Sequence, residues 1–417
     1  MKLEHFIARR LVTYKNTKSS ISKPIIKIAI AAIAIGMIMM IISVATGIGL
    51  QQKIREKVSA LNGHLIISNF DDNQSEVSRL PVSIQQEFYP EFKSVKGISH
   101  IQAVATKAGI IRTEETFEGI IFKGVGKDYQ WENFNEFIID GRKPYLDEEL
   151  NEEIIISEYL ANRLLLKAGD RFSTYFMKDD SNQPPNLRVF TVVGIYNSGF
   201  QEFDATYLIG DIRHIQRMNK WKPDEVGAFE VFIDDFDKID QKGEEVYNNT
   251  FNDKYYEQTL DTHTIKEKYY YIFEWLTLFD FNIAVILVIM IVVATINMAV
   301  ALLVLILERT QMIGILKSMG ANNWTIRKIF LYNAFHIITR GLIWGNAIAT
   351  LFIIVQKTWG VIKLNPENYY VTVAPVDFNI FHILLLNIGT ILVCLIVLLI
   401  PSYLITKISP VRAIRFD

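Results

Sequence analysis

Residue types that carry out catalysis or bind metal ions are sparse and scattered in this sequence. The seven histidines are spread over 417 residues, and none of the patterns HExxH, CxxC, GxSxG or the phosphate-binding GxxxxGK followed by Ser or Thr occurs. The acid-rich segment 147–153 has the composition of a solvated face. These observations predict a protein that is not itself an enzyme, binds no metal, and depends on another subunit if ATP drives it.

The segment Glu308–Phe330, ERTQMIGILKSMGANNWTIRKIF, indicates helix docking rather than catalysis. Four apolar residues follow the i, i+3, i+4, i+7 spacing of one helix face, with polar residues opposite. The apolar set is Met312, Ile315, Leu316 and Met319, and the polar set is Arg309, Gln311 and Lys317. Gly320 suits a helix stop, and Asn322 or Asn323 suits the cap of a second helix. We expect a helical hairpin whose apolar face packs on a partner protein or, alternatively, on lipid headgroups.

Long apolar runs on both sides of this hairpin indicate a membrane protein. About 20 apolar residues suffice to cross a bilayer, and uncharged runs of this length cover residues 28–50, 281–307 and 380–405. A fourth run, 329–355, is interrupted by Arg340. The first run is too long for a signal peptide and is followed by no small-residue cleavage site, so it is interpreted as a retained span.

Charge is distributed unevenly along the chain, and this distribution orients the spans. Residues 51–277 carry a net charge of about −13, whereas the first 50 residues carry about +6. Basic residues next to spans stay on the cytoplasmic side, and here the N-terminal set is Lys2, Arg9, Arg10, Lys15, Lys18, Lys23 and Lys27. Four spans then predict cytoplasmic N- and C-termini, a cytoplasmic hairpin helix at 309–320, and one large outer domain.

The outer domain, residues 51–277, is predicted to be mixed α/β. Stretches such as HLIISNF, GIIFKGV, RVFTVVGIY and AFEVFID alternate like strands, while IISEYLANRLLL has helical spacing. The single cysteine, Cys394, lies in the last span, so the outer domain must be held by its own core. The polar loop 177–188 is either an ordinary exposed hairpin or a docking loop. Residues 1–27 suit a helix in the membrane interface.

The third span combines small residues with a charge. Gly341, Gly345 and Ala349 recur every four residues and predict close packing against another helix. Arg340 directly precedes this stripe. A charge inside a span either snorkels to the interface or faces a polar interior and takes part in gating, and snorkelling is the favoured interpretation.

Motifs along nearly the whole chain resemble the permease superfamily of LolC/LolE, MacB and FtsX. ERTQMIGILKSMGA looks like the cytoplasmic coupling helix of that superfamily, and IPSYLITKISPVRAIRF resembles its closing Pro-x-x-Ala-x-Arg signature. FIARRL, LNGHLIIS, IISEYLANRLLLKAGDRF and FTVVGIYNSGFQEFDATYLI continue the resemblance in order. MacB-type exporters carry an N-terminal ATPase domain that this chain lacks, so the lipoprotein-releasing LolC/LolE type fits best.

The resemblance implies an α-helical membrane domain of four transmembrane helices plus a large mixed α/β extracytoplasmic domain inserted between helices 1 and 2. The expected organisation is an interfacial segment 1–27, a first span 28–50, a MacB-like periplasmic core 51–277 and an FtsX-like permease domain 278–417. The implied location is the bacterial cell inner membrane, with both termini in the cytoplasm and the large domain in the periplasm.

The implied function is to extract lipoproteins from the outer leaflet of the inner membrane and pass them to a periplasmic carrier. A separate cytoplasmic ABC ATPase would bind ATP and Mg²⁺, so this chain would bind no cofactor directly. A second permease subunit, identical or paralogous, would complete the transporter. No nucleic acid would be involved. The alternative is a MacB- or FtsX-type mechanotransmission permease that drives a periplasmic or outer-membrane partner in efflux or cell-wall hydrolase control. A membrane-anchored sensor without transport would leave the apolar face of the hairpin unexplained.

The resemblance also assigns roles to three sets of residues. The ATPase would dock on Arg309, Gln311, Met312, Ile315, Leu316, Met319 and Gly320. A lipoprotein cavity would be lined by Met37, Met40, Ile41, Val44, Asn282, Val285, Val292 and Asn297, chosen because they lie in the first two spans. Carrier docking falls, by position, on the loop that contains Asn182, Pro184 and Pro185, although a LolE-like role without carrier recruitment fits this loop equally well.

Overall fold

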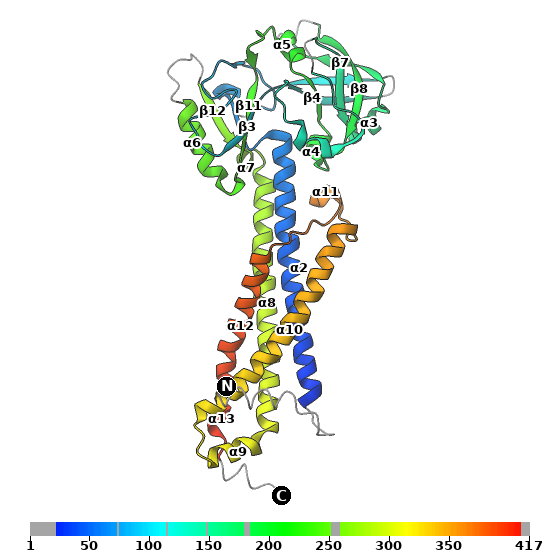
Figure 1. Ribbon diagram of the computed structural model, residues 1–417. Helices are drawn as coiled ribbons and strands as arrows, with labels where there is room; N and C mark the ends of the chain where they lie inside the picture. Colours follow the sequence, from blue (N-terminus) through cyan, green and yellow to red (C-terminus); the bar gives the residue numbers. More distant parts are fainter. Residues whose placement is uncertain are drawn as a thin grey trace. The chain divides into compact units, whose positions relative to one another are not determined.

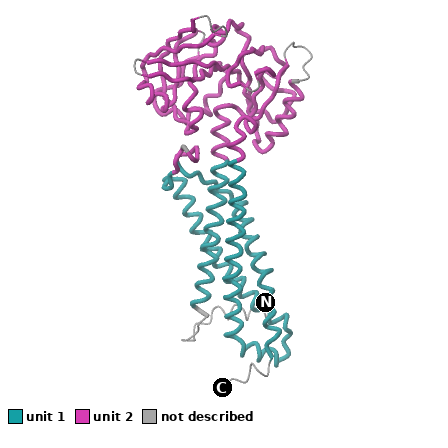
Figure 2. The backbone as a smooth tube through the Cα atoms, turned by 180° about the vertical axis from the view of Figure 1, so that it is seen from behind, with its two compact units in different colours: residues 1–51, 275–363, 373–417 teal, residues 52–274, 364–372 magenta. Residues whose placement is uncertain are grey.

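The computed structural model describes residues 22–72, 75–113, 116–146, 149–178, 184–251 and 259–409 (Figure 1). The chain divides into two compact units: unit 1 comprises residues 1–51, 275–363 and 373–417, and unit 2 comprises residues 52–274 and 364–372 (Figure 2). Most of the predicted interfacial helix 1–27, and the C-terminal signature 410–415, lie outside the described residues.

Among the described residues, four helices are long and apolar enough to cross a membrane, as predicted, and unit 1 holds all of them except the last turns of the first and the start of the second. They are α2 (Ser22–Asn62), α8 (Tyr270–Glu308), α10 (Asn323–Trp359) and α12 (Ile380–Ser402). Two short helices, α9 (Thr310–Ser318) and α13 (Leu404–Lys407), follow α8 and α12. The helices α2, α8 and α10 extend well beyond the apolar runs, because neither Gly nor Pro interrupts the flanking polar turns enough to end them.

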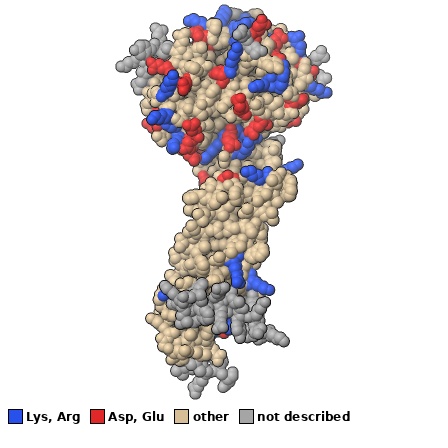
Figure 3. All heavy atoms as spheres, viewed as in Figure 1, with Lys and Arg blue, Asp and Glu red and all other residues tan. Residues whose placement is uncertain are grey.

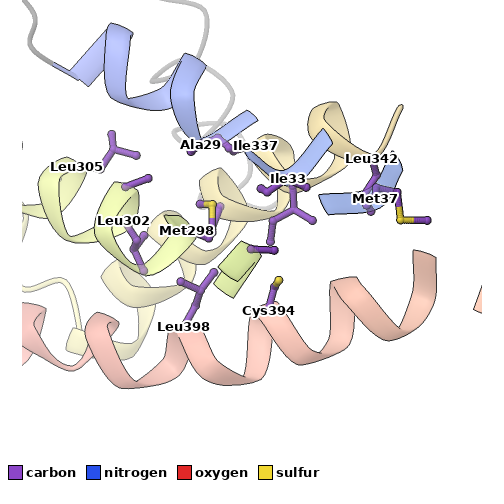
Figure 4. Packing of buried hydrophobic residues seen from close by; sticks show 14 of the residues in the cluster. Ala29, Ile33, Met37, Met298, Leu302, Leu305, Ile337, Leu342, Cys394 and Leu398 are labelled. Atoms are coloured by element: carbon purple, nitrogen blue, oxygen red, sulfur yellow. The ribbon is translucent and has the colours of Figure 1, made fainter. Parts of the chain in front are cut away.

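The four long helices share one apolar core. Figure 4 shows side chains from all four meeting there, among them Ile33 and Met37 of α2, Met298 and Leu302 of α8, Ile337 and Leu342 of α10, and Cys394 and Leu398 of α12. Polar contacts are added near one end of the spans, where the Gln51 side chain donates to Asp280 Oδ1 at 2.8 Å. Figure 3 shows that the visible face of the bundle carries few charged side chains, as a lipid-facing surface requires.

Unit 2 is the predicted mixed α/β domain and contains a ten-stranded sheet with the order β12-β1-β11-β3-β4-β9-β6-β8-β5 and with β7 paired to β3 and β8. The strands are β1 (Leu65–Asn69), β3 (Ile98–Arg112), β4 (Phe117–Val125), β5 (Ile138–Gly141), β6 (Glu153–Ser157), β7 (Arg171–Phe176), β8 (Asn186–Tyr196), β9 (Tyr207–Asp211), β11 (Ala228–Ile233) and β12 (Leu260–Thr264), with β2 (Val82–Ser83) and β10 (Glu225–Val226) forming a separate pair. Pairing is antiparallel except between β4 and β9 and between β6 and β8.

Six of these strands close into a small barrel, because the pairings run from β3 through β4, β9, β6, β8 and β7 back to β3. Its interior holds three fully buried rings, Phe122, Phe176 and Phe190. Phe122 stacks on Phe190 with ring centroids 5.2 Å apart, and Phe176 meets Phe122 edge-on at 6.0 Å. Closure removes sheet edges, which otherwise invite pairing with other chains.

Short helices complete unit 2: α3 (Glu158–Leu164), α4 (Gln201–Asp204), α5 (Arg213–Asn219), α6 (Ile239–Phe251), α7 (Ile265–Lys268) and α11 (Pro366–Tyr369). The stretch IISEYLANRLLL, predicted as helix throughout, divides between β6 and α3. Its isoleucines complete a buried strand, and Ser157 accepts a hydrogen bond from Leu160 N–H and caps the helix. The helix therefore begins three residues later than predicted, at Glu158 instead of Ile155.

Candidate functional site: the hairpin between the second and third spans

The predicted hairpin is present as α9 and the first turns of α10. The helix α9 spans Thr310–Ser318, slightly shorter than the predicted 309–320. Gly320 has a φ of 89°, a left-handed conformation that ends the helix without a steric penalty. Asn322 is the residue that caps α10, accepting a hydrogen bond from Trp324 N–H at 3.2 Å. Gly320 therefore ends the first helix of the hairpin, and Asn322 begins the second.

The face of α9 that packs on the bundle differs from the predicted one. Ile313, which the sequence interpretation left out, is fully buried in the core of unit 1. Met312 and Leu316 are partly buried against that core. Ile315 and Met319 are instead 46% and 78% exposed. The four-residue face is thus divided, because half of it packs on the chain's own helices.

Two basic side chains, those of Lys317 and Arg327, hold this end of unit 1 together. The Lys317 ammonium donates to the carbonyl oxygens of Ile405 and Ile408, both at 2.7 Å, and so satisfies the end of α13. Partial burial lowers the pKa of Lys317. Arg327 of α10 donates to Ser402 Oγ at 3.0 Å and to Leu399 O at 2.9 Å. The sequence analysis placed Lys317 on the polar side of the helix and predicted no partner for it within the chain.

The surface left open on α9 consists of Gln311, Ile315, Ser318, Met319 and Gly320. Ile315 and Met319 are four residues apart and therefore lie next to each other on the helix. Arg309 is half-buried at the junction of α8 and α9. An exposed apolar pair on a helix that is fixed from behind is suited to insertion into a groove of another protein.

The residues proposed for the lipoprotein cavity do not lie together. Met37, Met40 and Ile41 are buried in the core of the bundle, where a cavity on the outside of this chain cannot reach them. Ile41 and Val44 border a hollow of about 10 Å³, room for one water and not for an acyl chain. Periodicity on a fully apolar span cannot separate core from surface, which is why the prediction included α2 residues that are buried within the chain.

The α8 members of that set lie differently. Asn282, Val285 and Val292 are exposed, and half-buried Asn297 donates to Val293 O of its own helix at 2.9 Å. Of the predicted cavity residues, those on α8 therefore remain available to a lipid or to a second subunit.

The small-residue stripe of α10 lies against α2. A Cβ added to Gly341 would come within 2.7 Å of the Ile33 side chain, and one added to Gly345 within 2.8 Å of Met37 Cβ. Ala349, the third member, is fully buried. Two backbones thus approach closely at this crossing, the arrangement that small residues permit.

One polar pair in the spans was not predicted. Asn346 of α10 and Asn387 of α12 exchange side-chain hydrogen bonds of 2.8 and 3.0 Å. Each asparagine interrupts an otherwise apolar run, and that interruption is the signal that could have paired them. Such bonds fix the register of two helices where water is absent.

The predicted carrier-docking loop joins β7 to β8, which pair as an antiparallel hairpin. Asn182 lies outside the described residues, while Pro184 and Pro185 are exposed and lead directly into β8. Within the described ranges, no group of three or more His, Cys, Asp or Glu side chains is arranged to hold a metal ion.

Comparison with known proteins defines the class of this chain. The family described as MacB-like periplasmic core domain matches residues 28–246, and the family described as FtsX-like permease C-terminal matches residues 284–410. The chain therefore belongs to the MacB/FtsX superfamily of ABC transporter permeases, as its motifs predicted.

Individual relatives carry more specific names. The chain is 20% identical to the lipoprotein-releasing system transmembrane protein LolC of Haemophilus influenzae over 94% of this chain and 93% of that protein. LolC of Neisseria meningitidis is 21% identical, covering 100% and 99%, and LolE of H. influenzae is 20% identical, covering 99% of each. Among solved structures, the periplasmic region of MacB from Actinobacillus actinomycetemcomitans aligns with 49% of this chain and 92% of its own at 14% identity and a TM-score of 0.32.

Proposed function

We propose that this chain is the permease subunit of a transporter that removes lipoproteins from the outer leaflet of the bacterial inner membrane and passes them to a periplasmic carrier. A cytoplasmic ABC ATPase drives it, and a second permease subunit, identical or paralogous, completes the membrane part. The names and the near-complete coverage of the LolC and LolE relatives support the lipoprotein substrate. The ATPase supplies all nucleotide chemistry, and this subunit contributes no catalytic residue.

The observation that carries the proposal is the exposed pair Ile315 and Met319 on a helix held between two spans. Removing an acylated protein from a bilayer exposes chains that cost about 0.8 kcal/mol per CH₂, so the process needs an external energy source. A permease without a nucleotide site receives that energy through contact. The helix α9 connects directly to α8 and α10, so a displacement at α9 is passed to both spans.

The test is co-purification from native membranes in mild detergent. We expect Ile315→Glu or Met319→Glu to lower the amount of ABC ATPase that co-elutes by at least about tenfold, because a charge would be buried without a partner at the contact. These positions are better suited than Leu316, whose substitution would also disturb the bundle core. Leu165→Glu is the matched control, since Leu165 is an equally exposed leucine in unit 2.

Mass spectrometry of the co-eluting proteins distinguishes the two functions. An ATPase together with many different acylated lipoproteins supports extraction. An ATPase with a single periplasmic or outer-membrane partner and no lipoproteins would favour mechanotransmission over extraction. The match to the MacB-like periplasmic core domain is compatible with that alternative. Undiminished ATPase recovery in both charge variants would contradict docking through α9.

A further inference from the structure

Two cations lie exposed on the apolar bundle close to the crossing of α2 and α10. Lys27 and Arg340 are both exposed, and neither makes a hydrogen bond or an ion pair with any described residue. All other exposed side chains around Arg340 on its helix are apolar or aromatic, including Ile343 and Trp344. A guanidinium on such a surface needs a polar environment or an anion.

The packing of the two helices gives both cations a similar depth. A Cβ on Gly341 would lie 3.1 Å from Ile30 O, so Arg340 is level with the first turns of α2 after Lys27. The helices α2 and α10 run in the same direction through the bundle (Figure 1). Side chains lean toward the N-terminus of their helix, so both cations reach toward the same side of the membrane.

The remaining length of α10 matches one bilayer. From Arg340 to Trp359, where the helix ends, 19 residues rise about 28 Å, close to the roughly 30 Å of a hydrocarbon core. Trp344 and Tyr332, one and two turns from Arg340, are exposed aromatics of the kind found at membrane interfaces. A bilayer that covers this part of α10 would place Arg340 at the headgroup boundary, at one end of the spanning segment instead of inside the predicted span 329–355.

Within its apolar spans, a second copy of this chain offers these cations no acidic side chain. The apolar runs 28–50, 281–307, 329–355 and 380–405 contain no Asp or Glu. The acidic residues described in unit 1 lie elsewhere: Asp280 bonds to Gln51, Asp377 N–H bonds to Ala45 O, and Glu308 ends α8 next to α9. Two copies placed with these surfaces together would bring like charges into contact.

We propose that Lys27 and Arg340 bind the phosphate of an anionic glycerophospholipid in the leaflet that faces α9. A bidentate guanidinium and a flexible ammonium suit a phosphate group, and Trp344 and Ile343 line the path of its acyl chains. The lipid fixes the depth and tilt of α10 relative to the membrane. This inference uses the orientation in the proposed function only to name the leaflet as cytoplasmic.

Native mass spectrometry of the full-length protein in zwitterionic detergent, titrated with phosphatidylglycerol, tests the site. We expect Arg340→Ala to weaken binding of the tightest phosphatidylglycerol about fivefold, with a further loss in Lys27→Ala/Arg340→Ala. Arg340→Lys, which keeps the charge, should stay within about twofold of the wild type. Lys357→Ala is the matched control, because Lys357 is an exposed lysine near the opposite end of α10.

Unchanged phosphatidylglycerol binding in the double variant would overturn the site. So would loss of a co-purifying protein in Arg340→Ala without any change in lipid binding, since the cation would then face a protein partner. Both results are separable from failure of the proposed function, because the lipid titration needs neither the ATPase nor Ile315 and Met319.

Discussion

At the scale of single residues, the most constrained group in unit 2 is the buried ion pair Lys123–Glu230. Lys123 Nζ lies 2.5 Å from Glu230 Oε1 and donates also to Leu61 O, while Gln102 donates to Glu230 Oε2 at 2.8 Å. Burial lowers the pKa of Lys123, and the Glu230 carboxylate opposes that shift. Every charged atom of the pair is thus compensated, which is the condition under which buried charges persist.

Removing one partner should be more harmful than removing both charges. We expect Lys123→Met to lower the free energy of unfolding by about 3–5 kcal/mol, because Glu230 would be left charged and buried. Lys123→Met combined with Glu230→Gln should recover part of that loss, since the amide can still accept from Gln102. Urea unfolding of the purified full-length protein measures both. Equal losses in the single and double variants would contradict the coupling.

His64 should make the stability of unit 2 depend on pH. Burial lowers the pKa of His64 to about 4, and its Nδ1 accepts a hydrogen bond from Ile233 N–H at 2.9 Å. The unfolded chain, with a histidine pKa near 6.5, then binds more protons than the folded one between pH 6.5 and 4. Stability is therefore complete above pH 6.5 and falls by roughly 3 kcal/mol as the pH drops through that window.

The variant His64→Asn isolates this contribution, because an asparagine oxygen can accept the same hydrogen bond without titrating. We expect the melting temperature of the wild type, measured by intrinsic fluorescence, to fall relative to that of the variant as the pH drops from 6.5 to 4, because only the wild type has a buried group that must become protonated. Parallel curves over that range would assign the pH dependence to other groups.

At the scale of elements, the crossing of α2 and α10 depends on Gly345. A Cβ there would lie 2.9 Å from Ala34 O as well as close to Met37, so a larger side chain must separate the two helices. We expect Gly345→Leu to lower the melting temperature in detergent by several degrees, through overpacking that costs about 1–3 kcal/mol. Gly389→Leu on α12 is the control, because nothing lies within 4 Å of a Cβ at that position. Similar losses in both variants would count against close packing.

The helix α9 shows how far periodicity predicts an element. The residues from Met312 to Met319 predicted the helix and its stop at Gly320, because these depend on local chemistry. They could not predict which side is buried, since apolar residues occur on more than half of the helix circumference. Ile313 is buried because it faces the ends of α8 and α10, and only the fold places those helices behind it.

At the scale of the whole molecule, the elements that have a long local sequence pattern were predicted, and the pairings between distant segments were not. Three uncharged apolar runs and a fourth that contains Arg340 predicted four helices, and several strands of unit 2 followed from alternation. The closed barrel did not, because β3 pairs with β4 in one direction of the sheet and with β7 in the other, more than 60 residues away in sequence. No local pattern encodes such a closure.

The proposed orientation can be measured on the intact cell. The only native cysteine, Cys394, is fully buried, so a membrane-impermeant maleimide should label the wild type weakly. We expect Leu165→Cys to react once the outer membrane is permeable, and Met319→Cys only after the inner membrane is broken. Labelling of Met319→Cys before lysis would reverse the topology that the charge distribution predicts.

The contact between Lys317 and the end of α13 connects the hairpin to a third long helix, α12, in addition to the two that flank it in sequence. The helix α9 is continuous in sequence with α8 and α10 only, yet its lysine also holds the carbonyl oxygens that follow α12. A displacement of α9 would therefore act directly on α8, α10 and α12, and would reach α2 through the close packing of α2 on α10.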